Sequence, residues 1–308
     1  MCTKMFIIPE MENPLISVLM TAYNREQYIA EAIESVLAST FQDFELIIVD
    51  DCSVDTTVAI AKKYEQQNGK IKVYVNDVNL GQFKNRNKAA SFANGVYIKF
   101  FDSDDIMNND LLEVTMQAML SFPEAYVGIE CMWSKIPKAK LPVLFTSREA
   151  YINHFFQGND FLHYGPSSSI FKKSLFNECN GYNEEVGILA DTLLMLQLAA
   201  KSPVVGYKPY LFFRRRDDGQ VTVEQDNYYL MFCQRHQINS IVLNSRIPLS
   251  GHEVKIIKQN YKNIFIRNLF KYIWSIKNPV KLYNMIKIKD IKLTDIFRAL
   301  SKNKMVEY

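Results

Sequence analysis

Three aspartates follow directly on an apolar segment that the sequence predicts to be a buried strand. The segment is residues 96–101, and the residues after it are Asp102, Ser103, Asp104 and Asp105. Like charges held this close repel one another and are costly to remove from water. A divalent cation relieves both effects, because Mg²⁺ and Mn²⁺ prefer hard oxygen ligands. An acidic turn with a helix cap would use the same residue types, so this segment alone leaves both interpretations open.

Two further predicted strands also end in polar side chains. Residues 15–20 and 45–49 are short apolar runs of the kind that forms strands. The polar residues that follow these two runs are Thr21, Tyr23, Asn24, Asp50 and Asp51. Three separate strand ends therefore carry groups that could bind a polar ligand.

Helical patterns separate the predicted strands and indicate how the strands are arranged. The predicted helices are 28–37, 58–64 and 83–93, and a further short strand is predicted at 71–75. Asn24, with Gln27 three residues later, predicts the N-cap of the first helix. This alternation predicts an α/β fold with an open, mostly parallel sheet covered on both faces by helices. Ligands bind such sheets beyond the carboxyl ends of the strands, where the polar residues lie.

The order and spacing of these segments resembles family 2 of the glycosyltransferases over residues 14–222. The segments that carry the resemblance are 14–25, 35–45, 49–57, 79–81, 86–87 and 102–105. Cys52 stands where the family usually has Gly or Asn. The resemblance implies a GT-A (Rossmann-like) fold and an inverting transfer of a sugar from a nucleoside diphosphate donor, with UDP the expected nucleotide.

The resemblance also implies roles for the polar strand ends. It implies a nucleotide site made of Thr21, Tyr23, Asn24, Asp51, Arg86 and Asp102, with Lys84 as the alternative to Arg86. Tyr23 would stack near the base, Asp51 would hydrogen-bond the base, and Asp102 would hold the ribose. Asp104 would bind Mn²⁺ or Mg²⁺ at the diphosphate, and Asp105 is the alternative ligand if the local register differs.

Asp191 is the candidate general base, which would remove the proton of the acceptor hydroxyl. Its neighbours in 187–196 are almost all apolar, and a poorly solvated carboxylate has a raised pKa and is a better base. By resemblance this is also the position of the family's base, although Ala190 replaces the acidic residue that commonly precedes it. The alternative is an N-cap of a helix over 192–200, and the two roles are compatible.

Two other segments resemble parts of the family's site. Gly165, Ser167 and Ser168 fall where the family lines its sugar and acceptor pocket. Three consecutive arginines precede residue 217, and guanidinium groups can grip a diphosphate bidentately. Arg216 is the candidate from this run. A solvated charged loop and a loop leading into a strand are the alternatives for these segments.

Composition indicates an ordered globular chain that works in a reducing compartment. Of its 308 residues 48% are hydrophobic, which is ample for one large core and an appendage. The five cysteines are scattered and odd in number, which argues against a disulfide framework or a structural zinc site. Residues 1–10 do not resemble a signal peptide, and no apolar run approaches the ~20 residues that span a bilayer. We therefore expect a cytoplasmic protein.

The C-terminal part of the chain is strongly basic. The expected division is a catalytic domain at 14–222 and a basic helical region at 223–308. Residues 254–308 carry thirteen Lys and Arg against three acidic residues, while the whole chain has a net charge of only +3. A helical cap on the catalytic domain and peripheral contact with the inner face of an anionic membrane both fit this pattern. Nothing else in the sequence supports nucleic-acid binding.

These observations lead to two hypotheses of different classes. The leading one is a metal-assisted glycosyltransferase that acts on a hydroxyl of a glycan or lipid-linked glycan in polysaccharide synthesis. The other is a catalytically silent sugar-nucleotide binder or assembly protein, which Ala190 keeps open. A dinucleotide-dependent oxidoreductase is disfavoured, because no Gly-x-Gly-x-x-Gly follows the first strand.

Overall fold

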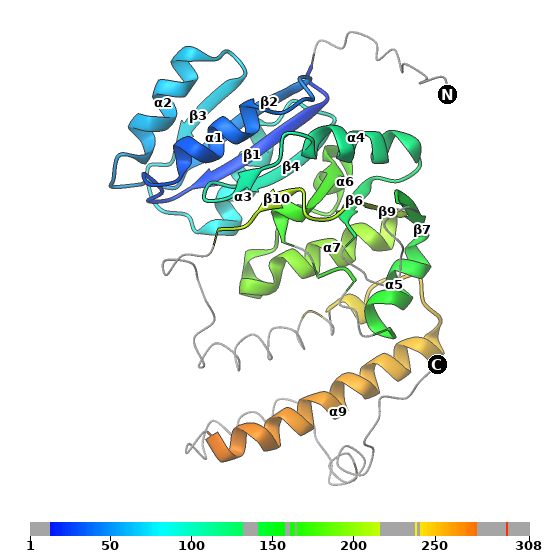
Figure 1. The fold of residues 1–308 in the computed structure, drawn as a ribbon. Coiled ribbons are helices and arrows are strands. Elements are labelled where there is room, and N and C mark those ends of the chain that lie inside the picture. The colour runs from blue at the N-terminus through cyan, green and yellow to red at the C-terminus, as the bar shows by residue number, and fades with distance from the viewer. Residues whose placement is uncertain are drawn as a thin grey trace.

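The computed structural model of the protein describes residues 13–131, 141–157, 161–163, 165–215, 238, 241–275 and 294. An eight-stranded mixed sheet lies at its centre, in the order β3-β2-β1-β4-β8-β6-β9-β7 (Figure 1). Its strands are β1 (Ile16–Ala22), β2 (Phe44–Asp50), β3 (Ile71–Val75), β4 (Tyr97–Asp102), β6 (Val127–Glu130), β7 (Val143–Phe145), β8 (Ser169–Lys172) and β9 (Val204–Tyr207). A two-stranded ribbon pairs β5 (Ile106–Met107) with β10 (Phe212–Phe213).

The half of the sheet that was predicted strand by strand is parallel. Strands β3, β2, β1 and β4 run in one direction, and β8 is antiparallel to both β4 and β6. The helices are α1 (Ile29–Leu37), α2 (Thr57–Gln67), α3 (Gln82–Phe92), α4 (Leu111–Ser121), α5 (Ser147–Phe155), α6 (Lys173–Glu178), α7 (Ala190–Lys201) and α9 (Gly251–Ser275). Two short 3-10 helices, η2 (Pro166–Ser168) and η3 (Glu184–Leu189), precede β8 and α7. The predicted α/β fold is confirmed.

Two apolar cores form because side chains alternate along the buried strands. Val18 and Met20 of β1 face a core that they share with α1 and α4, including Ile33. Leu19, between them, faces the opposite core with Phe83 of α3. Helices therefore cover both faces of the sheet, which leaves its carboxyl edge as the place where polar groups can gather.

Strand register brings the polar residues of separate strands to the same level. Thr21 of β1 pairs with Asp102 of β4, and Ala22 pairs with Asp50 of β2. Because the strands are parallel, the turns that follow them all open on one edge of the sheet. The residues that the sequence placed after these strands are therefore neighbours in space.

The turn after β1 differs from its prediction. Helix α1 begins at Ile29 with Tyr28 at the N-cap position, and no side chain caps it. Asn24 adopts a left-handed backbone conformation with φ of 51°. Its side-chain oxygen accepts a hydrogen bond from the backbone N–H of Val54 at 3.0 Å. The N-cap prediction for Asn24 is wrong, because this residue ties the β1 turn to the β2 turn instead.

Helix α9 packs against helix α5. Glu253 is buried and forms an ion pair with Arg148 of α5 at 2.6 Å. The rings of Tyr261 and Phe155 meet edge to face with their centroids 6.1 Å apart. Helix α9, which holds part of the basic segment, thus contacts α5, while the division into two domains stays a prediction. Over the described residues, no helix combines the length and the apolar character that a membrane crossing requires.

Candidate functional site

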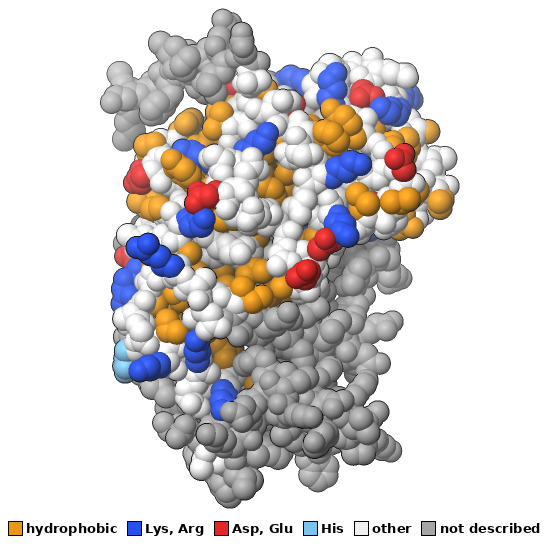
Figure 2. Space-filling view, turned by 180° about the vertical axis from the view of Figure 1, so that it is seen from behind, with side chains coloured by type: hydrophobic (Ala, Val, Ile, Leu, Met, Phe, Trp, Pro, Cys, Tyr) orange, Lys and Arg blue, Asp and Glu red, His pale blue; other side chains and the backbone are white. Residues whose placement is uncertain are grey.

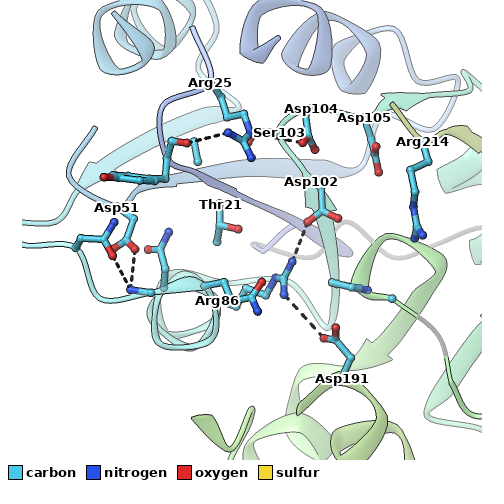
Figure 3. A pocket seen from close by; sticks show the side chains of 18 residues that line it. Thr21, Arg25, Asp51, Arg86, Asp102, Ser103, Asp104, Asp105, Asp191 and Arg214 are labelled. Carbon is cyan, nitrogen blue, oxygen red and sulfur yellow. Dashed lines mark hydrogen bonds and ion pairs between the residues drawn. The ribbon is translucent and has the colours of Figure 1, made fainter. Parts of the chain in front are cut away.

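A cleft with a volume of about 620 Å³ opens at the carboxyl edge of β1, β2 and β4. Figure 3 shows its walls, with Thr21 pointing into the space between Asp51 and Asp102. The residues that line it are Thr21, Ala22, Tyr23, Arg25, Asp51, Asn79, Gly81, Gln82, Asn85, Arg86, Asp102, Ser103, Asp104, Asp105, Gly165, Pro166, Asp191 and Arg214. Most of the residues proposed from the sequence therefore converge on one cavity.

Asp51 organises one end of the cleft. Its Oδ1 accepts hydrogen bonds from the Asn76 side chain and the Leu80 backbone N–H, both at 2.8 Å. Its Oδ2 accepts one from the Gly81 backbone N–H at 2.9 Å. A carboxylate that accepts several N–H bonds is firmly held, and Oδ2 keeps acceptor capacity beside the cleft. Tyr23, 45% exposed, supplies an aromatic ring near this end.

Arg86 joins two acidic residues that are far apart in the sequence. Its guanidinium lies 2.9 Å from the Asp102 carboxylate and 3.9 Å from that of Asp191, as Figure 3 shows. Burial by itself would lower the pKa of Arg86, but the charges of Asp102 and Asp191 outweigh it and raise that pKa above its ordinary value. Lys84, the alternative cation, is half-exposed and pairs with Glu184 at 3.0 Å. Arg86 is thus the one of the two that lines the cleft.

Asp191 lies in the first turn of α7 and faces the cleft. The N-cap position is Leu189, and no side chain caps this helix, so the predicted capping role is not observed. Burial raises the pKa of Asp191 to about 6, with Arg86 opposing the shift and Asp102 adding to it. Its Oδ1 accepts no hydrogen bond from the described residues. This carboxylate therefore has the environment and the free lone pair of a proton acceptor.

The acidic turn after β4 places Asp104 and Asp105 differently. Asp104 lines the cleft, and its Oδ2 lies 3.5 Å from the Arg25 guanidinium. Asp105 is 2% exposed, and its Oδ1 accepts a hydrogen bond from the Arg215 backbone N–H at 3.1 Å. Burial, followed by the charges of Asp102 and Asp104, raises the pKa of Asp105 to about 7. Asp104 is thus the more accessible of the two to a ligand.

The donor groups of this turn fit a metal ion that is completed by phosphate and water. Within the described ranges, no three His, Cys, Asp or Glu side chains are placed to hold a metal alone. Mg²⁺ commonly uses one or two carboxylates together with substrate phosphates. Asp104 supplies such a carboxylate, and the buried Asp105 Oδ2 lacks a hydrogen-bond partner. The oxygen donors therefore suit a cation that arrives with a diphosphate rather than a closed protein cage.

Three predicted site residues lie outside the cleft lining. Asn24 holds the turn described above, while Ser167 and Ser168 are buried behind the wall formed by Gly165 and Pro166. The Ser167 hydroxyl donates to Asp102 Oδ2 at 3.3 Å and accepts from the Asp102 backbone N–H at 3.2 Å. These serines therefore support the wall rather than form its surface.

Two cationic residues of the cleft were not proposed as site residues from the sequence. Arg25 and Arg214 both line it, whereas Arg216, the candidate from the arginine run, lies outside the described residues. The β10–β5 pairing and the Arg215–Asp105 hydrogen bond place Arg214 at the cleft. The arginine run was the available signal, and this long-range pairing places Arg214 of that run at the cleft.

Comparisons with known proteins give a family model and relatives that resemble this chain. The family described as Glycosyl transferase family 2 matches residues 17–179, more than half of the chain. Bacillus subtilis TuaG, a putative teichuronic acid biosynthesis glycosyltransferase, is 41% identical over 107 residues, which are 35% of this chain and 42% of TuaG. Escherichia coli WfgD, a UDP-Glc:alpha-D-GlcNAc-diphosphoundecaprenol beta-1,3-glucosyltransferase, is 38% identical over 110 residues, which are 36% of this chain and 43% of WfgD. The match thus spans less than half the length of these two relatives.

Solved structures share the fold. S. aureus TarS, residues 1–349, superposes with a TM-score of 0.64 at 20% identity, and the match covers 92% of this chain and 80% of that one. A TarS complex with UDP-GlcNAc has a TM-score of 0.60 at 22% identity, covering 92% and 79%. The Pyrobaculum calidifontis mannosyltransferase PcManGT, solved with GDP-Man and Mn²⁺, has a TM-score of 0.57 at 14% identity, covering 94% and 87%. At these identities the likeness establishes the fold.

Proposed function

The chain belongs to glycosyl transferase family 2, and from this premise we propose that it transfers a sugar, with inversion, from a nucleoside diphosphate donor to an acceptor hydroxyl. The observation that carries the proposal is one shared cleft in which strand-end carboxylates face Asp191 across Arg86. The acceptor is a glycan or a lipid-linked glycan of polysaccharide synthesis. WfgD, which uses UDP-Glc and a diphosphoundecaprenol-linked sugar, supports that setting.

The cleft offers complementary groups to each part of such a donor. Tyr23 and Asp51 suit the base, because an aromatic face stacks on it and a carboxylate accepts its N–H groups. Asp102 suits the ribose hydroxyls. The negative diphosphate would lie among the guanidinium groups of Arg25 and Arg214, which bind phosphate well. The TarS complexes with UDP and UDP-GlcNAc support UDP as the nucleotide.

The chain supplies charge and proton acceptance where the reaction needs them. Negative charge builds on the diphosphate as its bond to the anomeric carbon breaks, and fixed positive charge there is usually the largest catalytic term. Asp104, with Asp105 as the alternative, would hold the Mn²⁺ or Mg²⁺ that, when bound, acts as a Lewis acid on the leaving diphosphate. Asp191 would take the proton of the attacking hydroxyl on the opposite face of the sugar.

Donor binding is the first test of this proposal. We expect UDP-sugars with Mn²⁺ to raise the melting temperature of the full chain, because a ligand that binds only the folded state stabilises it. A panel of nucleotide sugars identifies the donor, and donor hydrolysis or transfer then separates an enzyme from a silent binder. ADP-ribose serves as a matched control, since it has a diphosphate and a sugar but another base. Absence of any nucleotide-sugar effect would contradict the proposed function.

Peripheral membrane contact through α9 is a second proposal, suited to a lipid-linked acceptor. The helix buries Ile257 and Phe265, while Lys255 and Lys258 are exposed and the acidic Glu253 is buried. In Figure 2 the lower left of the described surface carries Lys, Arg and His side chains without an acidic neighbour. Each basic residue near an anionic surface contributes about 1 kcal/mol.

Charge reversal tests this contact in the full chain. The double substitution of Lys255→Glu with Lys258→Glu should weaken co-sedimentation with phosphatidylglycerol vesicles by more than about tenfold at low salt. The matched control reverses Lys63 and Lys72, which are exposed on α2 and β3, and should leave vesicle binding unchanged. Equal binding by both double variants would remove the membrane role from this face of α9.

A further inference from the structure

A wholly buried lysine lies behind the wall of the cleft. Lys99 is on β4, three residues before Asp102, and is 0% exposed. Its ammonium donates hydrogen bonds to the backbone carbonyl of Ser167 at 2.8 Å and to that of Ser169 at 3.4 Å. Lysine is almost never fully buried unless it is paired, because the charged form loses its hydration. We therefore expect an opposite charge near Lys99 and a structural role for its ammonium group.

Glu130 is the compensating group. It ends β6, is 2% exposed, and accepts a hydrogen bond from the Tyr210 backbone N–H at 3.3 Å. Burial lowers the pKa of Lys99 to about 8, and the negative charge of Glu130 opposes the shift. Burial likewise raises the pKa of Glu130, and Lys99 opposes that shift. Each residue thus favours the charged form of the other, although no ion pair within 4 Å joins them and Glu130 Oε1 has no hydrogen-bond partner among the described residues.

The segment that Lys99 holds is connected to the donor site on its other side. The Ser167 hydroxyl exchanges hydrogen bonds with the Asp102 carboxylate and backbone N–H, at 3.3 and 3.2 Å. Gly165 and Pro166, just before Ser167, line the cleft. Fixing the Ser167 carbonyl therefore also fixes an Asp102 contact and part of the cleft wall.

Stability alone is a weak reason for this pair. Replacing a buried ion pair with uncharged residues of similar volume is often neutral or stabilising, whereas removing one partner is strongly destabilising. An apolar residue at position 99 would also suit the core on this face of β4, which holds Tyr97 and Phe101. The ammonium supplies what an apolar side chain would lack, namely two hydrogen bonds to the carbonyls of the wall.

We propose that Lys99 is a positioning residue that fixes residues 165–169 and through Ser167 orients Asp102 toward the nucleotide. The proposal concerns the same cleft and rests on the proposed function for its ligand. Neither Lys99 nor Glu130 lines the cleft, so both act through the wall and not by contact with the donor.

A charge-free double variant separates positioning from stability. Lys99→Met with Glu130→Gln removes both charges and keeps an acceptor for the Tyr210 N–H. We expect this double variant of the full chain to melt close to the wild-type temperature but to bind UDP about tenfold more weakly, as expected for loss of one hydrogen bond to a charged group. Adding Ser167→Ala should weaken binding no further, because the three residues act along one chain of contacts.

Wild-type UDP affinity in the double variant would overturn the proposal. Should that variant fail to fold, Ser167→Ala alone tests the last link, and unchanged UDP affinity there would equally overturn it. Amide hydrogen exchange of residues 165–169 in the ligand-free protein gives a reading that does not depend on the proposed function. Faster exchange in the double variant, with exchange elsewhere unchanged, supports positioning even if UDP is not the ligand, while unaltered exchange contradicts it.

Discussion

Replacing Asp191 with asparagine should nearly abolish sugar transfer while nucleotide binding stays within a few fold of wild type. Asparagine keeps the size of the side chain and a hydrogen-bonding oxygen, but its amide cannot accept the acceptor's proton. A positioned base contributes about 10² to 10⁴-fold, so kcat should fall by that factor. Because Asp191 touches Arg86 only at 3.9 Å, its loss leaves the 2.9 Å pair between Arg86 and Asp102 in place. The measurements are kcat and the UDP dissociation constant by calorimetry.

The pH dependence of transfer by the wild-type enzyme is a second test of Asp191 as the base. A base works only when deprotonated, and burial raises the pKa of Asp191 to about 6. Transfer should therefore rise with pH through about 6 and level off above it, and this limb should vanish in Asp191→Asn. Glu184→Gln is the matched control, because Glu184 lies seven residues earlier, is exposed and pairs with Lys84 at the surface. Wild-type turnover in Asp191→Asn would remove Asp191 from its role.

Much of this site could be predicted because parallel strands that end together must open on one edge. The apolar runs at residues 15–20, 45–49 and 96–101 predicted the ends of β1, β2 and β4 to within two residues. The pairing of Thr21 with Asp102 then follows from sheet geometry. Asp191 was found by different means, since an ionisable residue in an apolar run stands out wherever the fold places it.

The rest depends on contacts that local sequence does not encode. The sequence does not distinguish Arg86 from Lys84 as the cation of the site. Both lie on α3, and the direction in which each side chain leaves the helix decides which one lies between Asp102 and Asp191. The resemblance predicts Ser167 in the sugar and acceptor pocket, yet its hydroxyl contacts Asp102 from behind the cleft wall. A polar residue can contact the ligand itself or hold another residue that does. For Ser167 a contact with Asp102, 65 positions away in the sequence, decides between the two roles.

Arg86 links the two ends of the proposed chemistry. Its guanidinium contacts the carboxylate expected to hold the donor ribose and lies near the one expected to act as base. Its charge opposes the rise in the pKa of Asp191 that burial causes, and so keeps more of that carboxylate ionised near neutral pH. The donor end and the acceptor end of the cleft therefore share one buried cation.

Substituting Asp104 with asparagine should remove the effect of metal on both binding and turnover. An amide oxygen is a much weaker ligand for Mn²⁺ than a carboxylate, and Asp104 is less buried in the cleft lining than its neighbour Asp105. We expect Mn²⁺ to strengthen UDP binding to the wild-type chain and to have little effect on Asp104→Asn, with turnover reduced by at least about 10²-fold. Calorimetry with and without Mn²⁺ measures this directly, apart from any activity assay.

Asp105→Asn is the matched comparison, because it makes the same chemical change one residue away. Asp105 is 2% exposed and accepts the Arg215 backbone N–H, and asparagine can still accept that bond. The Asp105 variant should therefore keep the Mn²⁺ dependence of UDP binding that the Asp104 variant loses. The reverse pattern would assign the metal to Asp105. Wild-type Mn²⁺ dependence of UDP binding in both variants would exclude each carboxylate as the essential ligand.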